Sequence, residues 1–481
     1  MDKDLKMPSP YLSVIPIVVL VILLAITIHL FGSDALSGGS QICLLLASGV
    51  CTLLSTVFCN TKWKILESGI IDNVSSVTTA LFILLLIGAL SGSWMLSGVV
   101  PILIYYGIQL LRPEIFLVSC CIISAIISLM TGSSWTTIAT IGVALMGIGQ
   151  AQGFSVGWVA GSIISGAYFG DKISPLSDTT VLASSTTHTP LFDHIRYMLY
   201  TTIPSIIITL IVFLIAGALI NRNEGSQTVA YTEALSHTFH LTPWLLFVPL
   251  LTGIMIAKKM PSLVVLFLSA LLGVLFALWF QPEVLRSISG LENEGTQALW
   301  KGAYQSVFGS TQINTGDASL NKLVATHGMR GMLDTIWLIL CAMCFGGTMS
   351  ASGMLRSLVT LFIRFMKKRV SMVVSTVMSG LLLNLCTGDQ YISIVLTGNL
   401  FKDIYKKKGY ESRLLSRTTE DAVTVTSVLI PWNTCGMTQA TILGVPTLTY
   451  LPYCIFNIVS PIMSIFIAAI GYKIVCIYEK N

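Results

Sequence analysis

Two aspartates stand on either side of a proline in residues 166–180, GAYFGDKISPLSDTT. Pro175 separates Asp171 from Asp178, and a proline in that position interrupts a helix and frees backbone carbonyl groups. Carboxylates beside unwound backbone at membrane depth are typical of the cation sites of transporters. We interpret this stretch as a Na⁺ or proton site in a broken transmembrane helix. The alternative is a solvated loop, in which Gly, Asp, Ser and Pro are ordinary turn residues.

Oxygen-bearing side chains near this stretch, and in a similar stretch of the second half, are the candidate ion ligands. Sodium is a hard cation, and hard cations prefer oxygen ligands. Burial favours the protonated form of a carboxylate and a nearby cation favours the ionised form, so one carboxylate can hold either a proton or Na⁺. We expect Asp171 and Asp178 to bind Na⁺, with no cofactor. The full set comprises the carboxylates of Asp171, Asp178 and Asp389, the hydroxyls of Ser133, Ser134, Thr136, Ser177, Thr179 and Thr387, and the amide of Asn433.

Charged neighbours of these residues are candidates for a proton or charge relay. Glu420 and Asp421 are adjacent, so they point to different faces of a helix and at most one should reach the ion site. The other then faces Arg417 or Lys172. The sequence leaves open whether Lys172 is an internal counter-ion or a surface residue.

Histidine and cysteine give weaker signals. His188 and His194 follow the broken helix and could sense pH, because histidine titrates near neutrality, but ordinary loop histidines are the favoured interpretation. The eleven cysteines are scattered through apolar runs, and the pair Cys341 and Cys344 has no second pair to complete a zinc pattern. We interpret the cysteines as buried apolar residues.

Composition places these residues in a membrane. The chain is 54% hydrophobic and 10% charged, against about 25% charged in soluble domains. Uncharged runs such as residues 11–31 and 448–472 are long enough to cross a bilayer, which takes about 20 residues. The first run follows Lys3 and Lys6 without a cleavage site, so we expect a retained span. The net charge of +5 lies in loops and indicates no nucleic-acid partner.

Glycine and proline punctuate the two halves of the chain at the same spacing. A shift of 256 positions brings Gly388 onto Gly132 and Pro431 onto Pro175. Short polar joints at 131–134 and 387–390 predict two re-entrant hairpins, since such backbone survives in a membrane only when it is buried or lines a wet cavity. For the first joint, two full spans with an exterior turn are the alternative. We expect a single domain over 1–481, with a first repeat core at 73–200, a second at 335–446, scaffold spans in 1–72, 200–280 and 447–481, and an external polar connection at 281–334.

Basic residues predict that the two cores cross the membrane in opposite senses. Residues 364–417 contain ten Lys or Arg, whereas the matching window 108–161 contains only Arg112. The positive-inside rule then places the loops of the second core in the cytoplasm and those of the first outside. Lys62 and Lys64, with Lys473 and Lys480, place both termini in the cytoplasm. The prediction is an all-α polytopic membrane protein: an inverted-repeat secondary transporter with two re-entrant helical hairpins and two broken helices, whose ion site lies where the breaks meet.

Residues 166–180, preceded by TGSSWTT at 131–137, closely resemble the NhaC-type Na⁺/H⁺ antiporters of bacteria, as does DAVTVTSVLIPWNTCG at 421–436. The resemblance spans nearly the whole chain. It implies Na⁺/H⁺ exchange across the bacterial inner membrane and membership of the ion-transporter superfamily. It also implies a mobile core of hairpins and broken helices against a scaffold of the other spans.

Rival functions differ in what they would require. The resembled family also contains exchangers of small organic acids such as malate and lactate, so Na⁺/H⁺-coupled transport of a carboxylate or an amino acid is the alternative. An intramembrane enzyme would need a nucleophile with its base, or a metal set, and no histidine lies in the hairpins or broken helices to serve. A channel would need an open pore. The sequence leaves open the stoichiometry, the preference among Na⁺, Li⁺ and K⁺, and a homodimer.

Overall fold

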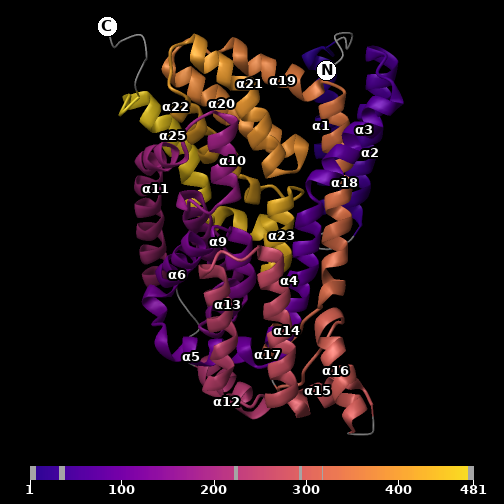
Figure 1. Cartoon of the computed structure of the whole chain (residues 1–481), viewed down its shortest axis with the longest axis vertical. Helices are drawn as coiled ribbons and strands as arrows, with labels where there is room; N and C mark the ends of the chain where they lie inside the picture. Colours follow the sequence, from indigo (N-terminus) through magenta and orange to yellow (C-terminus); the bar gives the residue numbers. More distant parts are fainter. Residues whose placement is uncertain (1–6, 32–37, 221–225, 292–294, 317, 475–481) are drawn as a thin grey trace.

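The computed structural model describes residues 7–31, 38–220, 226–291, 295–316 and 318–474 (Figure 1). Lys3, Lys6 and Lys480 lie outside these ranges. Within them the regular structure is helical, apart from one isolated bridge between Thr311 and Thr326. Eight helices are long and apolar enough to span a membrane, or up to ten if two bent helix pairs each count as one span. The predicted all-helical, multi-span architecture is therefore confirmed.

The spanning candidates are distributed along the whole chain. The bent pairs are Thr228–Thr238 with Pro243–Ala257, at 96°, and Thr447–Tyr453 with Ile455–Ile470, at 56°. The eight single candidates are α1 (Pro10–Phe31), α2 (Gly39–Cys59), α4 (Thr78–Leu96), Pro113–Thr131 with α6 (Phe116–Thr131), α11 (Leu191–Leu219), α14 (Ser262–Phe280), Met329–Ala351 with α18 (Leu333–Ala351), and α20 (Arg369–Thr387).

Two sets of helices repeat along the chain. Helices α9 and α22 begin 256 positions apart, as do α10 and α23. Figure 1 shows α5, which follows α4, at the lower end of the molecule, and α19, which follows α18, at the upper end. The helices that follow α4 and α18 therefore lie at opposite ends of the molecule. The first set adds α5 (Val99–Leu110), α7 (Ser134–Thr137), α8 (Val143–Ala151), α9 (Val156–Ile173) and α10 (Asp178–Thr186); the second adds α19 (Met354–Arg364), α21 (Gln390–Lys407), α22 (Ser412–Thr419) and α23 (Thr434–Leu443).

Each half contains a helical hairpin with the same turn. Helix α6 is capped by Gly132 at φ +66° and α20 by Gly388 at φ +67°, a left-handed conformation that glycine adopts without steric cost. In both turns the threonine before the glycine accepts a hydrogen bond from the backbone N–H of the residue after it, at 3.1 Å for Thr131 and 3.2 Å for Thr387. The two turns are thus built by the same residue pattern 256 positions apart.

Alanine at the two turn glycines should destabilise the protein to different degrees. Both positions have positive φ, which costs a side chain roughly 1–2 kcal/mol. A Cβ at Gly132 would also lie 2.6 Å from the backbone carbon of Leu176, whereas at Gly388 it would meet the Ala342 methyl at 3.2 Å. We expect Gly132→Ala to lower the melting temperature in detergent clearly more than Gly388→Ala. An equal fall in melting temperature for the two variants would show that close packing of residues 174–177 against the first turn adds no cost at Gly132.

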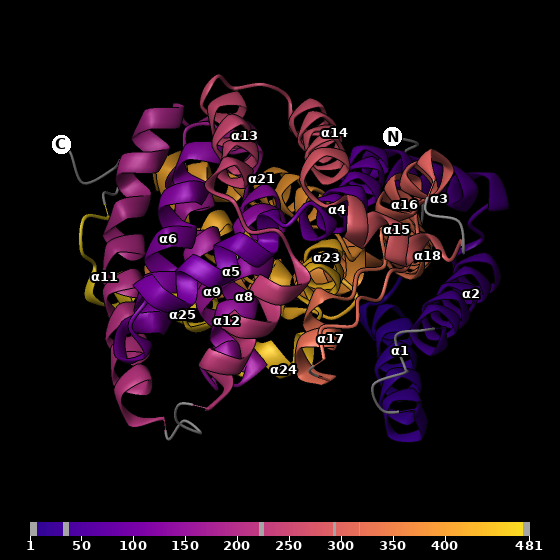
Figure 2. The same cartoon turned by 90° about the horizontal axis from the view of Figure 1, so that it is seen from below.

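Both predicted helix breaks are present. Helix α9 ends at Ile173 and α10 begins at Asp178, so residues 174–177, with Pro175, are not helical. In the second half the helical stretch ends at Leu429 and resumes at Thr434, around Pro431. Figure 2 shows α9 and α23 in the interior, with α1–α3 and α11 on opposite flanks. The breaks therefore lie inside the helical bundle.

Several segments depart from the sequence-based boundaries. The span expected to start at residue 73 starts at Thr78, because residues 63–76 form a separate helix, α3 (Trp63–Ser76). The span expected from residue 200 begins at Leu191. The polar connection 281–334 is largely helical, with α15 (Pro282–Ser289), α16 (Thr296–Phe308) and α17 (Ala318–Val324), and α16 packs on α4, where the Gly92 Cα lies beside the Ser306 carbonyl.

Candidate functional site

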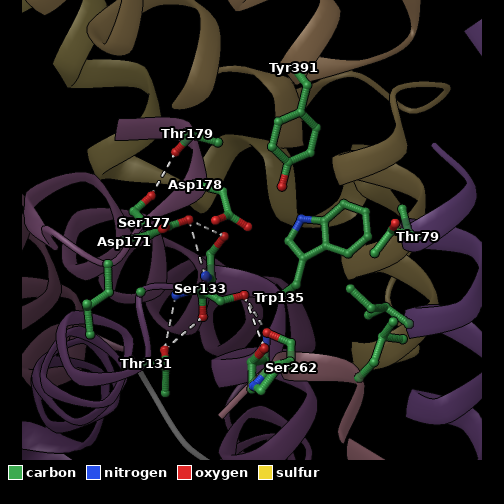
Figure 3. A pocket seen from close by; sticks show the side chains of 18 of the residues that line it. Thr79, Thr131, Ser133, Trp135, Asp171, Ser177, Asp178, Thr179, Ser262 and Tyr391 are labelled. Carbon is green, nitrogen blue, oxygen red and sulfur yellow. Dashed lines mark hydrogen bonds between the residues drawn. The ribbon is translucent and has the colours of Figure 1, made fainter. Parts of the chain in front are cut away.

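A cavity of about 700 Å³ lies between the two hairpin turns (Figure 3). Its walls also include the start of α4, the break between α9 and α10, and the turn between α13 (Phe247–Ala257) and α14. All of the expected ion ligands line it except Thr387 and Asn433. The polar lining residues are Ser76, Thr79, Thr131, Ser133, Ser134, Thr136, Asp171, Ser177, Asp178, Thr179, Lys259, Ser262, Asp389, Gln390 and Tyr391.

Asp171 joins the first helix break to the first hairpin. Its side chain is buried, with 6% exposed, near the end of α9. The Oδ2 atom accepts hydrogen bonds from the Ser134 backbone N–H at 3.2 Å and from the Ser134 hydroxyl at 2.8 Å. Ser134 begins helix α7, and the N-terminus of a helix carries partial positive charge that stabilises a carboxylate. The first turn therefore holds Asp171 in place.

Asp178 presents a carboxylate to the open part of the cavity. It is the first residue of α10 and is exposed. The preceding Ser177 caps the helix by accepting from the Thr180 backbone N–H and shares a 3.0 Å hydrogen bond with the Thr179 hydroxyl. Figure 3 shows Asp171, Ser177 and Asp178 together on one wall, opposite Trp135 and Tyr391. Asp178 can therefore reach an ion that enters the cavity.

Asp389 performs in the second half the capping role that Ser133 performs in the first. Its Oδ1 atom accepts from the Ile392 backbone N–H at 3.0 Å, as the Ser133 hydroxyl accepts from that of Thr136 at 3.2 Å. Its Oδ2 atom accepts from the Thr434 hydroxyl at 3.0 Å. Asp389 is 2% exposed yet lines the cavity.

The two halves carry a carboxylate and a hydroxyl at equivalent pairs of positions, but in the opposite order. In the first half the turn carries Ser133 and the helix after the break begins with Asp178. In the second half the turn carries Asp389 and the corresponding helix begins with Thr434. Each half therefore contributes one carboxylate and one hydroxyl at equivalent positions, and Asp171 is the additional acid.

Thr387 and Asn433 lie outside the cavity lining and support it. The Thr387 hydroxyl donates to the Asp389 carbonyl at 3.0 Å and shares a 2.8 Å hydrogen bond with Ser393. The Asn433 side chain caps α23 through the Cys435 backbone N–H at 3.1 Å. Both residues shape the second turn and break without presenting a ligand to the cavity.

Two aromatic residues that the sequence analysis did not assign to the site also line the cavity. Trp135 and Tyr391 occupy equivalent positions, one in each hairpin, 256 apart. The Trp135 indole nitrogen is buried and has no hydrogen-bond partner among the residues that the structure describes, and Figure 3 shows the Tyr391 hydroxyl directed toward it and Asp178. The sequence signal that could have identified them is that the 256-residue shift superimposes Tyr391 on Trp135. Lys259, in the turn before α14, also lines the cavity and could not be placed there from sequence.

A second polar cluster lies apart from the cavity. The Lys172 ammonium forms an ion pair with Asp421 Oδ1, and both side chains are fully buried. The same oxygen accepts from the Thr201 hydroxyl at 3.1 Å and the Ser460 hydroxyl at 3.2 Å. Lys172 is therefore an internal counter-ion, which decides between the two alternatives that the sequence left open.

The two histidines after the broken helix differ in environment. His188 lies in the turn after α10, with φ +54°. His194 is not a loop residue: it lies buried in α11, where its Nδ1 is 2.8 Å from the Ser416 hydroxyl. Helix α11 begins before the apolar run by which the span was predicted from the sequence, so His194 was wrongly predicted to lie in a loop.

Comparison with known proteins identifies the family. The sequence profile described as "Na+/H+ antiporter family" matches residues 166–472. The chain is 37% identical over 429 residues to the Na⁺/H⁺ antiporter NhaC of Alkalihalophilus pseudofirmus, covering 88% of this chain and 89% of the relative. This chain belongs to the Na⁺/H⁺ antiporter family.

Two relatives in Bacillus subtilis show the range of substrates within the Na⁺/H⁺ antiporter family. The Na⁺/H⁺ antiporter NhaC is 34% identical over 410 residues, covering 84% of this chain and 87% of the relative. The malate-2H⁺/Na⁺-lactate antiporter is also 34% identical, over 455 residues, covering 94% and 92%. The chain is thus a membrane transporter rather than an enzyme, and overall identity does not choose between ion exchange and organic-acid exchange.

Proposed function

We propose that this protein exports Na⁺ in exchange for H⁺ across the bacterial inner membrane by alternating access. The observation that carries the proposal is the charge of the cavity: among the described residues that line it, Asp171, Asp178 and Asp389 face a single basic residue, Lys259. The remaining polar lining is mainly hydroxyl groups, which are ligands that a hard cation accepts. Proton and Na⁺ compete for the carboxylates, which couples the two fluxes.

The arrangement of the halves supports alternating access. We infer that the two hairpins are re-entrant and belong to inverted repeats, so that their turns meet near the bilayer midplane. The Ser357 hydroxyl of α19 donates to the Pro8 carbonyl, and Arg369 at the start of α20 donates to the Ala468 carbonyl, so the start of α1 and the end of α25 (Ile455–Ile470) lie at one end. That end carries basic residues between α19 and α20, and we assign it to the cytoplasm.

Transport measurements on the purified protein in liposomes test the proposal. An imposed Na⁺ gradient should drive H⁺ in the opposite direction, read by a pH-sensitive dye trapped inside, and the signal should be absent from protein-free liposomes. Failure of the Na⁺ gradient to move protons would contradict the proposal. Single-channel currents would instead show an open pore.

Exchange of a small carboxylate or amino acid with Na⁺ and H⁺ is the second candidate function. The cavity volume of about 700 Å³ favours it, because this is within the range of pockets that hold small organic molecules. An organic anion would need a cationic partner, and Lys259 is the candidate, since Lys172 is already paired with Asp421. Na⁺-dependent uptake of labelled malate, lactate or an amino acid without Na⁺-driven proton movement would establish this function.

A further inference from the structure

Glu420 is a buried acid to which the proposed exchange cycle gives no role. It begins a π-helical turn, Glu420–Thr424, that continues α22, and its side chain is fully buried. Among the described residues, neither of its carboxylate oxygens has a hydrogen-bond partner. The adjacent Asp421, in contrast, is held by Lys172 and two hydroxyls. π-Helical turns occur frequently at functional sites.

The charged groups that face Glu420 come from two directions. On α9, Lys172 pairs with Asp421, the residue after Glu420, and Asp171 directly precedes Lys172. All three interact electrostatically with Glu420. One turn earlier, Arg417 is fully buried, and its Nε lies 3.9 Å from Asp421 Oδ2 with the guanidinium over the Tyr197 ring. Within the described part of the chain, its guanidinium nitrogens make no hydrogen bond.

The other elements packed on this turn bring few charges near it. Helix α25 has no charged residue, and α10 has only Asp178, at its start. Helix α20 has only Arg369, at its first position, and the charged residues of α21 lie in its second half, from Lys402 onward. Partly exposed Arg413 lies at the start of α22. Apart from Asp171 at the cavity wall, the buried charged groups around Glu420 are therefore Lys172, Arg417 and Asp421, whose formal charges sum to +1.

Glu420 decides the net charge of this cluster. When it is ionised, the formal charges of these four groups sum to zero. Among the described residues, however, its carboxylate makes no hydrogen bond, and the nearby Thr424 hydroxyl is also unpaired, so a buried charge is left incompletely compensated. When Glu420 is protonated, the cost of burying its carboxylate charge disappears, but the positive charge of Arg417 then has no negative charge in this cluster to balance it. Each form carries one penalty that the other lacks, so both forms are accessible.

A cation in the cavity shifts this balance in one direction. Asp171 lines the cavity and directly precedes Lys172, whose ammonium pairs with Asp421, the residue after Glu420. Na⁺ beside Asp171 cancels the negative charge that opposes ionisation of Glu420, so Na⁺ binding favours loss of the Glu420 proton. By linkage, protonation of Glu420 weakens Na⁺ binding by the same factor.

We propose that Glu420 carries a transported proton at a second site outside the cavity and releases it when Na⁺ binds beside Asp171. This rests on the proposed Na⁺/H⁺ exchange. The transporter would then exchange one more proton per Na⁺ than it would if protons bound only to the cavity carboxylates.

The decisive experiment measures the number of protons per Na⁺ in Glu420→Gln. In liposomes with equal Na⁺ on both sides and a fixed pH gradient, the membrane potential at which net ²²Na⁺ flux vanishes gives that number, and a net flux that does not depend on the potential indicates one proton per Na⁺. Glu420→Gln should move one proton fewer per Na⁺. Because glutamine resembles the protonated form, its ²²Na⁺/Na⁺ counterflow should also need more Na⁺ than wild type to reach half of its maximal rate. Glu420→Asp, which keeps a carboxyl group, and Glu411→Gln, at a partly exposed glutamate paired with Arg413, should keep the wild-type number.

A binding measurement tests the same point without turnover. Addition of Na⁺ to the purified protein in weakly buffered detergent solution should release one proton fewer from Glu420→Gln than from wild type. An unchanged number of protons, in transport or in release, would overturn the inference. Failure of Glu420→Gln to fold would also overturn it, because glutamine resembles the protonated form that the cycle must visit. If wild type itself shows no Na⁺-driven proton movement, the proposed function fails instead.

Discussion

Asp171→Asn should lower Na⁺-driven proton movement by roughly two orders of magnitude, since removal of a charged ligand costs about 3 kcal/mol. Asparagine has nearly the same shape and its amide oxygen can still accept both hydrogen bonds from Ser134. The first turn should therefore keep its position while the site loses the carboxylate for which Na⁺ and H⁺ compete. The measurement is the initial rate of the internal pH change in liposomes.

A matched control separates this effect from a general loss of fold. Asp193→Asn makes the same chemical change at an exposed position in the first turn of α11 and should exchange like wild type. Saturating Na⁺ should raise the melting temperature of wild type and Asp193→Asn, because a ligand at 100 times its dissociation constant stabilises by about 2.7 kcal/mol. It should leave that of Asp171→Asn unchanged. Unaltered exchange in Asp171→Asn would remove this residue from the site.

The hairpins and breaks could be predicted from the sequence because single residues dictate them. Gly132 and Gly388 adopt a backbone conformation that few other residues tolerate, and proline cannot continue a helix through Pro175 or Pro431. These signals are local and survive low overall similarity between the halves. The structure places the aspartates beside them, Asp171, Asp178 and Asp389, on one cavity, and their binding of Na⁺ stays a prediction.

The rest of the site depends on tertiary contacts that leave no local mark. Lys259 reaches the cavity because the α13–α14 turn folds back against the first hairpin, and in the sequence it is an ordinary basic turn residue. The helices within 281–334 are short and mixed in polarity, and α16 packs on α4 where Gly92 allows the Ser306 carbonyl to approach closely, which no run of apolar residues announces. Lys172 and Asp421 are 249 positions apart, and only the fold shows that they pair.

That pair leads to the largest expected loss of stability. Removal of one partner from a buried ion pair leaves an uncompensated charge and costs about 3–5 kcal/mol. The two single substitutions should differ. Lys172→Met leaves Asp421 with the Thr201 and Ser460 hydroxyls and with Arg417 nearby. Asp421→Asn leaves two buried cations, Lys172 and Arg417, and should be the more damaging of the two.

The double variant Lys172→Met/Asp421→Asn should recover most of the stability, because it buries no unpaired charge from this pair. Melting temperatures in detergent for the wild type, the two single variants and the double variant complete the cycle. Arg413→Met, which breaks the partly exposed pair with Glu411, serves as the control and should cost little. If the losses of the two single variants simply add in the double variant, the two charges do not stabilise one another. The link that they form between α9 of the first half and the π-helical turn of the second would then contribute nothing to holding the halves together.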